Sequence, residues 1–361
     1  MCYNVKCTGF SVTKIQKQVF MKKKIFAALA LVATTFVFAA CNNSNQKLSF
    51  NPNWEAGILS EATTATKETL TYEVTHAPGA FLNEGSFTVA YGGVDNATPG
   101  TYTTTLEYTA TGYEYKTELK LPVVFTLASG ETVTKEDVIT THAVFKFAAN
   151  SLQPVSSTKR VHCHSPNNIS ATTIERTYTE FDYEFHIQYN DDLTGGTLTR
   201  TDYSKDLTLL VYKDRYPEKK AVTEFEIEQK KLTYLDNEQL LFAFRGLSSA
   251  NIASTQSMNV YNASLLTMEK ITTTPAAETK TDFKFSLNGG EKLDREVTYI
   301  PVSIKSDNKH VENEQVLWYA KTTSNDSNAY RNVLLKMTVP MHYGLGSLTY
   351  TLSDATFLIE G

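Results

Sequence analysis

The stretch that decides the fold is FDYEFHIQY, residues 181–189. Large apolar side chains alternate here with polar ones, and the apolar set is Phe181, Tyr183, Phe185, Ile187 and Tyr189. A period of two places the two sets on opposite faces of a β-strand. The stretch therefore predicts a strand with one buried face and one face in water.

The same alternation recurs from about residue 70 to the end of the chain, in runs that begin at Leu70, Phe87, Tyr102, Tyr113, Phe225, Phe283 and Leu348. Turn residues separate many runs, at Gly92-Gly93, Pro99-Gly100, Ser129-Gly130, Gly195-Gly196 and Asn288-Gly289-Gly290. Parallel sheets are buried on both faces and read as continuous apolar runs, so alternation favours antiparallel pairing. We expect a mainly β protein whose large antiparallel sheet is curved into a half-barrel with one or two short helices. The alternative is two β-sandwich domains.

Helix is expected at one or two places. Residues 237–245 offer Asp236 as an N-cap, Gln239 for a capping box and Gly246 as a terminator, with an apolar stripe of Leu240, Leu241 and Phe244. A weaker candidate covers residues 53–65. A helix of about nine residues among strands must bury its stripe against a sheet, so we expect a plug or lid.

The N-terminal segment predicts export. Three lysines follow Met21, and residues 25–40 form a 16-residue apolar run. As a helix this run would span about 24 Å, which is short of the ~30 Å hydrocarbon core and typical of a signal peptide. The run ends in Phe38-Ala39-Ala40-Cys41, which resembles the lipobox of bacterial lipoproteins, where the cysteine thiol receives a diacylglycerol and the preceding peptide bond is cut. The alternative is a membrane anchor followed by an incidental cysteine.

These features divide the chain into four parts. We expect residues 1–20 to be an upstream extension before a start at Met21, residues 21–40 the signal peptide, residues 41–52 a polar tether, and residues 53–361 the β domain, with a subdivision near 213–221 if there are two domains. Two acyl chains on Cys41 would anchor the protein stably. We expect it in the cell envelope, outside the cytoplasmic membrane or at the outer membrane of a Gram-negative cell.

The charge of the chain disfavours a nucleic-acid partner. The net charge is −5, from 34 basic and 39 acidic residues, and six of the lysines precede Cys41. Without that segment 28 basic residues face 39 acidic ones, a net charge of −11. Such a surface repels phosphate, and no basic stripe is present in the sequence.

The triplet His162-Cys163-His164 contains residues that bind zinc or copper. In a strand, however, the two histidines share one face and the cysteine points to the other, so the three cannot converge on one ion. We therefore predict no metal site. No G-x-S-x-G motif, HExxH motif or other catalytic spacing is present either. We expect a protein that is not an enzyme and uses no cofactor.

Several stretches together resemble the lipoprotein-carrier superfamily (LolA- and LolB-like), whose fold is a curved antiparallel half-barrel around an apolar cavity closed by short helices. An opening strand would be LTYEV at residues 70–74, and FKF at 145–147 would run into LQPVSS at 152–157 as a strand and its turn. The helix ending FRGL at 244–247 would follow, and closing strands would lie at 316–321, 334–340 and 346–350. The resemblance is one of layout, and it implies binding of an acyl chain or other apolar ligand without catalysis.

Aromatic residues carry the remaining information about function. The 20 tyrosines and 19 phenylalanines fall largely on the apolar side of strands, either as a filled core or as the wall of a ligand cavity. Candidate cavity residues are Tyr183, Phe185, Tyr189, Trp318 and Tyr319. The favoured function is binding of an apolar or lipid-like ligand by a membrane-anchored lipoprotein. The alternative is a structural or adhesive β-sandwich that binds glycan or protein at the cell surface.

Overall fold

A computed structural model of the chain describes residues 65–79, 87–109, 112–148, 151–166, 173–204, 219–227, 234–245, 254–263, 266–307, 315–320, 333–341 and 344–359. Cys41, the signal peptide, the tether and residues 53–64 of the weaker helix lie outside the described residues. Within the described part, no helix is long and apolar enough to cross a membrane.

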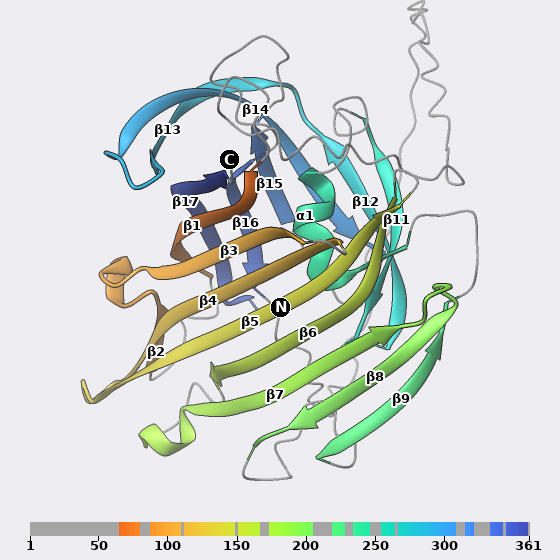
Figure 1. Ribbon diagram of the computed structural model, residues 1–361. Coiled ribbons are helices and arrows are strands. Elements are labelled where there is room, and N and C mark those ends of the chain that lie inside the picture. Colours follow the sequence, from red (N-terminus) through yellow and green to blue (C-terminus); the bar gives the residue numbers. More distant parts are fainter. Residues whose placement is uncertain are drawn as a thin grey trace, which may run out of the picture.

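The described chain is dominated by strands, which join into a single curved sheet (Figure 1). The first half contributes β1 (Ala65–Pro78), β2 (Phe87–Tyr91), β3 (Gly100–Thr109), β4 (Gly112–Leu127), β5 (Thr132–Ala148), β6 (Ser151–Pro166), β7 (Tyr178–Tyr189), β8 (Gly195–Asp202) and β9 (Lys220–Glu226). The second half contributes β10 (Tyr234–Asp236), β11 (Gln256–Asn262), β12 (Thr267–Pro275), β13 (Thr279–Leu287), β14 (Leu293–Ser306), β15 (Gln315–Ala320), β16 (Leu334–Met341) and β17 (Gly346–Ile359). The expected mainly β, antiparallel class is confirmed.

The pairing of β1 joins the two halves, because β1 pairs with β3 on one edge and with β17 on the other. From β3 the order runs through β4, β5, β6, β7 and β8 to β9, and from β17 through β16, β15, β14 and β12 to β11 and β10. These ladders are antiparallel, except that β10 pairs with β11 in parallel. The described strands thus form one curved sheet and not the two β-sandwich domains of the alternative prediction.

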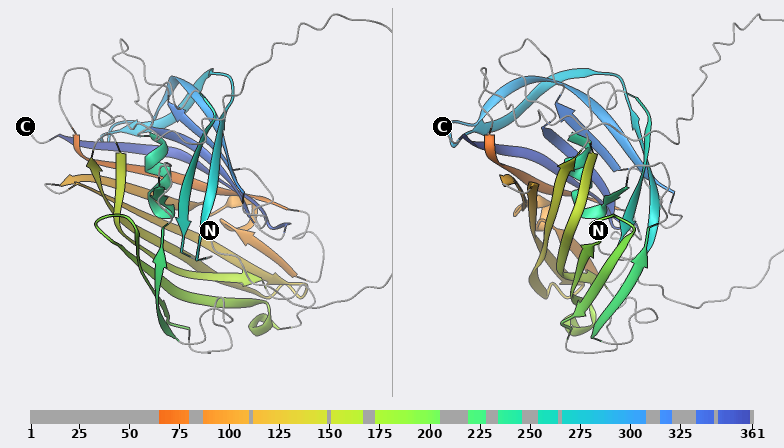
Figure 2. Two further views of the ribbon diagram at one scale, coloured as in Figure 1. Left: turned by 90° about the vertical axis from the view of Figure 1, so that its right-hand side faces the viewer. Right: turned by 45° about the vertical axis from the view of Figure 1, so that its right-hand side comes forward.

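The sheet curls until its two ends meet, which gives a barrel-like shape (Figure 2). The Phe225 ring of β9 stacks on the Tyr261 ring of β11, with centroids 4.0 Å apart and planes 12° from parallel. The short strand β10 lies beside β6, which is far from it in the hydrogen-bonded order. Side-chain packing between strands from the two ends therefore helps to close the sheet.

The helix forms at the predicted residues and acts as a plug, but its buried side differs from the predicted stripe. Phe242 and Ala243 are buried with Phe244, whereas Leu240 and Leu241 are only half-buried. The helix begins with a 3-10 turn, η6 (Asn237–Gln239), and continues as α1 (Leu240–Arg245), inside the curve of the sheet (Figure 1). Phe242 and Phe244 are each only 1% exposed. The Phe242 ring lies 4.9 Å from that of Phe145, and the Tyr319 hydroxyl donates to the Leu241 carbonyl at 3.3 Å. The helix thus connects β5 with β15 across the interior.

Two local expectations were wrong. Gly195 and Gly196 do not form a turn but begin β8, because neighbouring strands approach too closely for a side chain. A Cβ on Gly196 would lie 2.4 Å from the Gln188 carbonyl oxygen and 2.9 Å from the Phe225 ring. Residues 152–157, expected as a turn, belong to β6, where they pair with the end of β5.

Candidate functional site

The inner face of β7 carries the aromatic wall that the sequence predicted. Tyr183, Phe185 and Tyr189 are at most 5% exposed and belong to one apolar cluster, together with Tyr261 of β11. The polar residues between them are half-buried or exposed. The prediction from the alternation along β7 is therefore confirmed, because the aromatic rings lie on the buried face of this strand.

Tyr319 and Trp318 do not join that wall. Tyr319 is 1% exposed and lies in the larger apolar cluster, which contains α1. Trp318 is half-buried, and the Lys336 ammonium lies 5.1 Å from the centroid of its ring. Neighbouring residues of a strand point to opposite faces, so this pair could not have lined one cavity. The structure brings together three of the five candidates.

A buried carboxyl lies beside the aromatic wall. Asp236 ends β10, precedes η6 and is 1% exposed. Its Oδ1 accepts from the Glu238 backbone N–H at 2.8 Å, which caps η6 as predicted. Its Oδ2 accepts from the Ser157 hydroxyl at 2.8 Å and from the Tyr189 hydroxyl at 2.5 Å. The cap thus also fastens η6 to β6 and β7.

Burial governs the protonation of this group. Desolvation raises the pKa of Asp236 to about 6, the nearby negative charge of Glu238 adds to the rise, and the hydrogen bonds from Tyr189, Glu238 and Ser157 oppose it. Burial would likewise raise the pKa of Glu238, but the Lys159 ammonium, 3.0 Å away, holds it below its ordinary value. Desolvation and the charge of Asp236 raise the pKa of Tyr261 to about 12. The cluster therefore holds one paired cation and one carboxyl that titrates near neutrality.

Two polar groups of the cluster make no hydrogen bond within the described part of the chain. Gln239 is 0% exposed, yet both its amide oxygen and its amide nitrogen are without a partner. The hydroxyl of Tyr261, which is 3% exposed, also has no hydrogen-bond partner there. Tyr261 is the register partner of Asp236, and η6 packs against β5, β6 and β11. The capping box expected of Gln239 is therefore absent, because its side chain is drawn into the interior.

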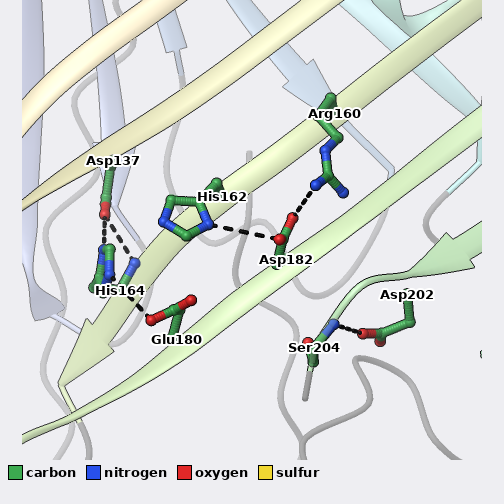
Figure 3. A network of polar contacts seen from close by, with 8 residues as sticks. All are labelled: Asp137, Arg160, His162, His164, Glu180, Asp182, Asp202 and Ser204. Carbon is green, nitrogen blue, oxygen red and sulfur yellow. Dashed lines mark hydrogen bonds and ion pairs between the residues drawn. The ribbon is translucent and has the colours of Figure 1, made fainter.

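The two histidines of the triplet, His162 and His164, lie in a different network (Figure 3). His162 and His164 share a face, with ring centroids 5.2 Å apart, while Cys163 is buried in the inner apolar cluster. Nδ1 of His164, which is 2% exposed, lies 2.9 Å from Oδ1 of Asp137. Asp182 faces both His162, at 3.9 Å, and Arg160, at 2.5 Å.

This network ties strands together and offers no metal site among the described residues. Oδ1 of Asp137 also accepts from the His164 backbone N–H at 2.8 Å, so β5 holds β6 through both contacts. Desolvation raises the pKa of Asp137, and the contacts with His164 oppose that rise. The carboxylates that could have completed a metal site instead pair with the histidines and with Arg160.

No family model and no curated protein matches the chain. A crystal structure of a β-barrel-like protein with a domain of unknown function, from Brucella abortus, is similar at 9% sequence identity and a TM-score of 0.44. The match covers 81% of this chain and 98% of that one.

Sequence reasoning identified the aromatic wall and the cap but missed the polar cluster between them. The sequence predicts Asp236 and Gln239 only as helix-capping residues, and Ser157 only as part of a turn. The available sign was parity along β6: Ser157 and Lys159 fall in the same alternating set as the buried Val161 and Cys163. Two polar residues on the buried face of a strand need polar partners in the interior.

Proposed function

We propose that this protein is a lipid-anchored lipoprotein of the cell envelope that binds an apolar or amphipathic ligand on the inner face of its curved sheet, without transforming it. The main support is that the aromatic wall of β7 lies beside buried polar groups that have no partner in the described chain. Ligand sites in proteins combine an apolar lining with a few polar groups of this kind. Buried polar atoms in a finished core are normally hydrogen-bonded.

Catalysis is not part of the proposal. Asp236 is the carboxyl of the cluster with a pKa raised to about 6, but its two oxygens already accept three hydrogen bonds. Glu238 is engaged by Lys159. The groups most suited to proton transfer are therefore committed to holding η6 in place. Binding of a ligand needs only the polar groups that have no partner, which are the Gln239 amide and the Tyr261 hydroxyl.

The binding proposal is tested by native mass spectrometry on the full chain, purified from membranes in a mild detergent. We expect a population that carries one apolar molecule, which is released on denaturation and identified by its mass. A protein that carries no such molecule, and also fails to bind an added fluorescent apolar probe, would overturn the proposal.

The anchor is tested separately. Metabolic labelling with a clickable fatty acid should mark the full chain, and Cys41→Ala should abolish the label. Cys163→Ala is the matched control, because Cys163 is buried in the apolar interior and offers no route to acylation. Unchanged labelling of Cys41→Ala, or loss of label from Cys163→Ala alone, would contradict lipidation at Cys41.

A further inference from the structure

We infer that the polar end of the ligand is an uncharged group that both donates and accepts hydrogen bonds, such as a carboxamide or hydroxyl, and that Gln239 and Tyr261 receive it. This inference rests on the proposed function and names the class of ligand. It follows from three features of the polar cluster: which atoms are unpaired, which charges are compensated, and which chemistry complements the remaining groups.

The unpaired atoms define what the ligand must offer. The Gln239 amide presents one acceptor oxygen and a donor NH₂, and the Tyr261 hydroxyl can both donate and accept. Leaving such groups buried without a partner is costly, whereas a complementary group satisfies them. Asp236 does not compete for the ligand, because Glu238, Ser157 and Tyr189 already occupy its oxygens. A ligand group with both a donor and an acceptor would therefore complement the unpaired atoms of Gln239 and Tyr261.

The charges disfavour a carboxylate at this place. Lys159 is the cation of the cluster, and it is paired with Glu238 at 3.0 Å. Arg200, the buried cation on the inner face of β8, is paired with Asp202 at 2.6 Å. A fatty-acid carboxylate beside Asp236 would lose its water next to another acidic group, with no uncommitted cation among these residues to compensate it. A neutral head group avoids that penalty.

The aromatic wall provides for the apolar part of such a molecule. Tyr183, Phe185 and Tyr189 occupy alternate positions of β7, and Tyr189 is the ring whose hydroxyl reaches Asp236. The wall thus meets the polar cluster at Tyr189. A long-chain amide or alcohol would lay its chain along the rings and its head group toward Gln239 and Tyr261.

The test compares ligands that share one oleyl chain and differ in the head group. Oleamide, oleyl alcohol, oleate and oleylamine compete with a fluorescent apolar probe for the full-length protein, at pH 7.5. We expect oleamide and oleyl alcohol to bind at least about tenfold more tightly than oleate, whose charge would be buried beside Asp236 without a partner. Oleylamine should also bind more weakly than oleamide, because an ammonium offers no acceptor to the Gln239 NH₂ and the oxygens of Asp236 are already occupied. Equal or tighter binding of either charged ligand would overturn the inference.

Variants assign the effect to the two residues. Gln239→Leu should weaken oleamide binding about tenfold relative to the binding of the apolar probe by the same variant. Gln188→Leu makes the same chemical change on the exposed face of β7 and should alter neither. Tyr261→Phe removes only a hydroxyl, keeps the ring that stacks on Phe225, and should weaken oleamide binding severalfold even if Gln239→Leu fails to fold.

The outcomes separate this inference from the proposed function. If the probe binds but oleamide affinity is unchanged in both Gln239→Leu and Tyr261→Phe, the head-group assignment is wrong and the apolar site stands. If neither the probe nor any of the four ligands binds the wild-type chain, the proposed function fails and this inference fails with it.

Discussion

Replacing Asp236 by Asn should change how the stability of the fold depends on pH. The pKa of this carboxyl rises from an ordinary 3.8 in the unfolded chain to about 6 in the fold. Between these values the folded state binds a proton that the unfolded state has released, so the free energy of unfolding falls as the pH rises. A difference of about 2.2 pH units at 1.36 kcal/mol each makes this loss roughly 3 kcal/mol.

An asparagine side chain does not titrate, so residue 236 no longer makes the free energy of unfolding fall as the pH rises. Its amide can still accept from one neighbour, and the hydroxyls of Ser157 and Tyr189 can rotate to accept from its NH₂. Any cost of the exchange itself is therefore independent of pH.

The assay is urea unfolding of both proteins at pH 4, 5, 6 and 7. Relative to the wild type, the free energy of unfolding of Asp236→Asn should rise by about 2 kcal/mol between pH 4 and pH 7, with most of the change below pH 6. Other titrating groups, including Asp137 and Glu238, are present in both proteins and largely cancel. Parallel pH profiles of the two proteins would refute the argument that Asp236 is held in a desolvated site.

Three substitutions test the packing that positions the site. Phe242→Ala should lower the free energy of unfolding by about 3–5 kcal/mol, because this ring is 1% exposed among aromatic neighbours; a loss below 1 kcal/mol in urea unfolding would show that α1 is not an integral plug. Tyr319→Phe should lower the free energy of unfolding by about 1 kcal/mol, because the hydrogen bond to the Leu241 carbonyl is lost. An unchanged denaturation midpoint would show that this bond does not stabilise the fold. Gly196→Ala should cost about 1–3 kcal/mol by forcing β7 and β9 away from β8, and faster amide exchange confined to these strands would locate the effect, whereas wild-type stability would contradict the close approach.

Local patterns were enough to predict many of the strands and the place of the helix. Alternation in residues 181–189 predicted the inner and outer faces of β7, and Asp236 with the stripe after it predicted where the helix begins. These predictions succeed because a strand repeats every two residues and a helix is capped by its immediate neighbours, so the information lies within a few positions. The same reasoning failed at Gly195-Gly196, where the need for glycine comes from Phe225 on another strand.

The polar cluster could not be predicted in this way. Asp236 accepts from Tyr189, 47 positions earlier, and from Ser157, 79 positions earlier. The sequence predicts Tyr189 only as a ring of the apolar face and a candidate for a cavity wall, and Ser157 only as part of a turn, because nothing near either residue in the sequence indicates a carboxyl across the barrel. Their meeting depends on how far the sheet curls and on where η6 enters it.

By itself the sequence determined the strands with regular alternation, the place of the helix, the antiparallel class and which side of β7 is apolar, because each of these depends on a pattern along one segment. The tertiary structure alone decided that β1 joins the two halves, that β9 and β11 meet, and that Tyr319 lies in the core while Trp318 faces away from it. It also decided that Gln239 and Tyr261 are buried without partners in the described chain. Curvature brings distant residues together, and the free energy of a buried polar atom depends on its neighbours in space and not on its neighbours in the chain.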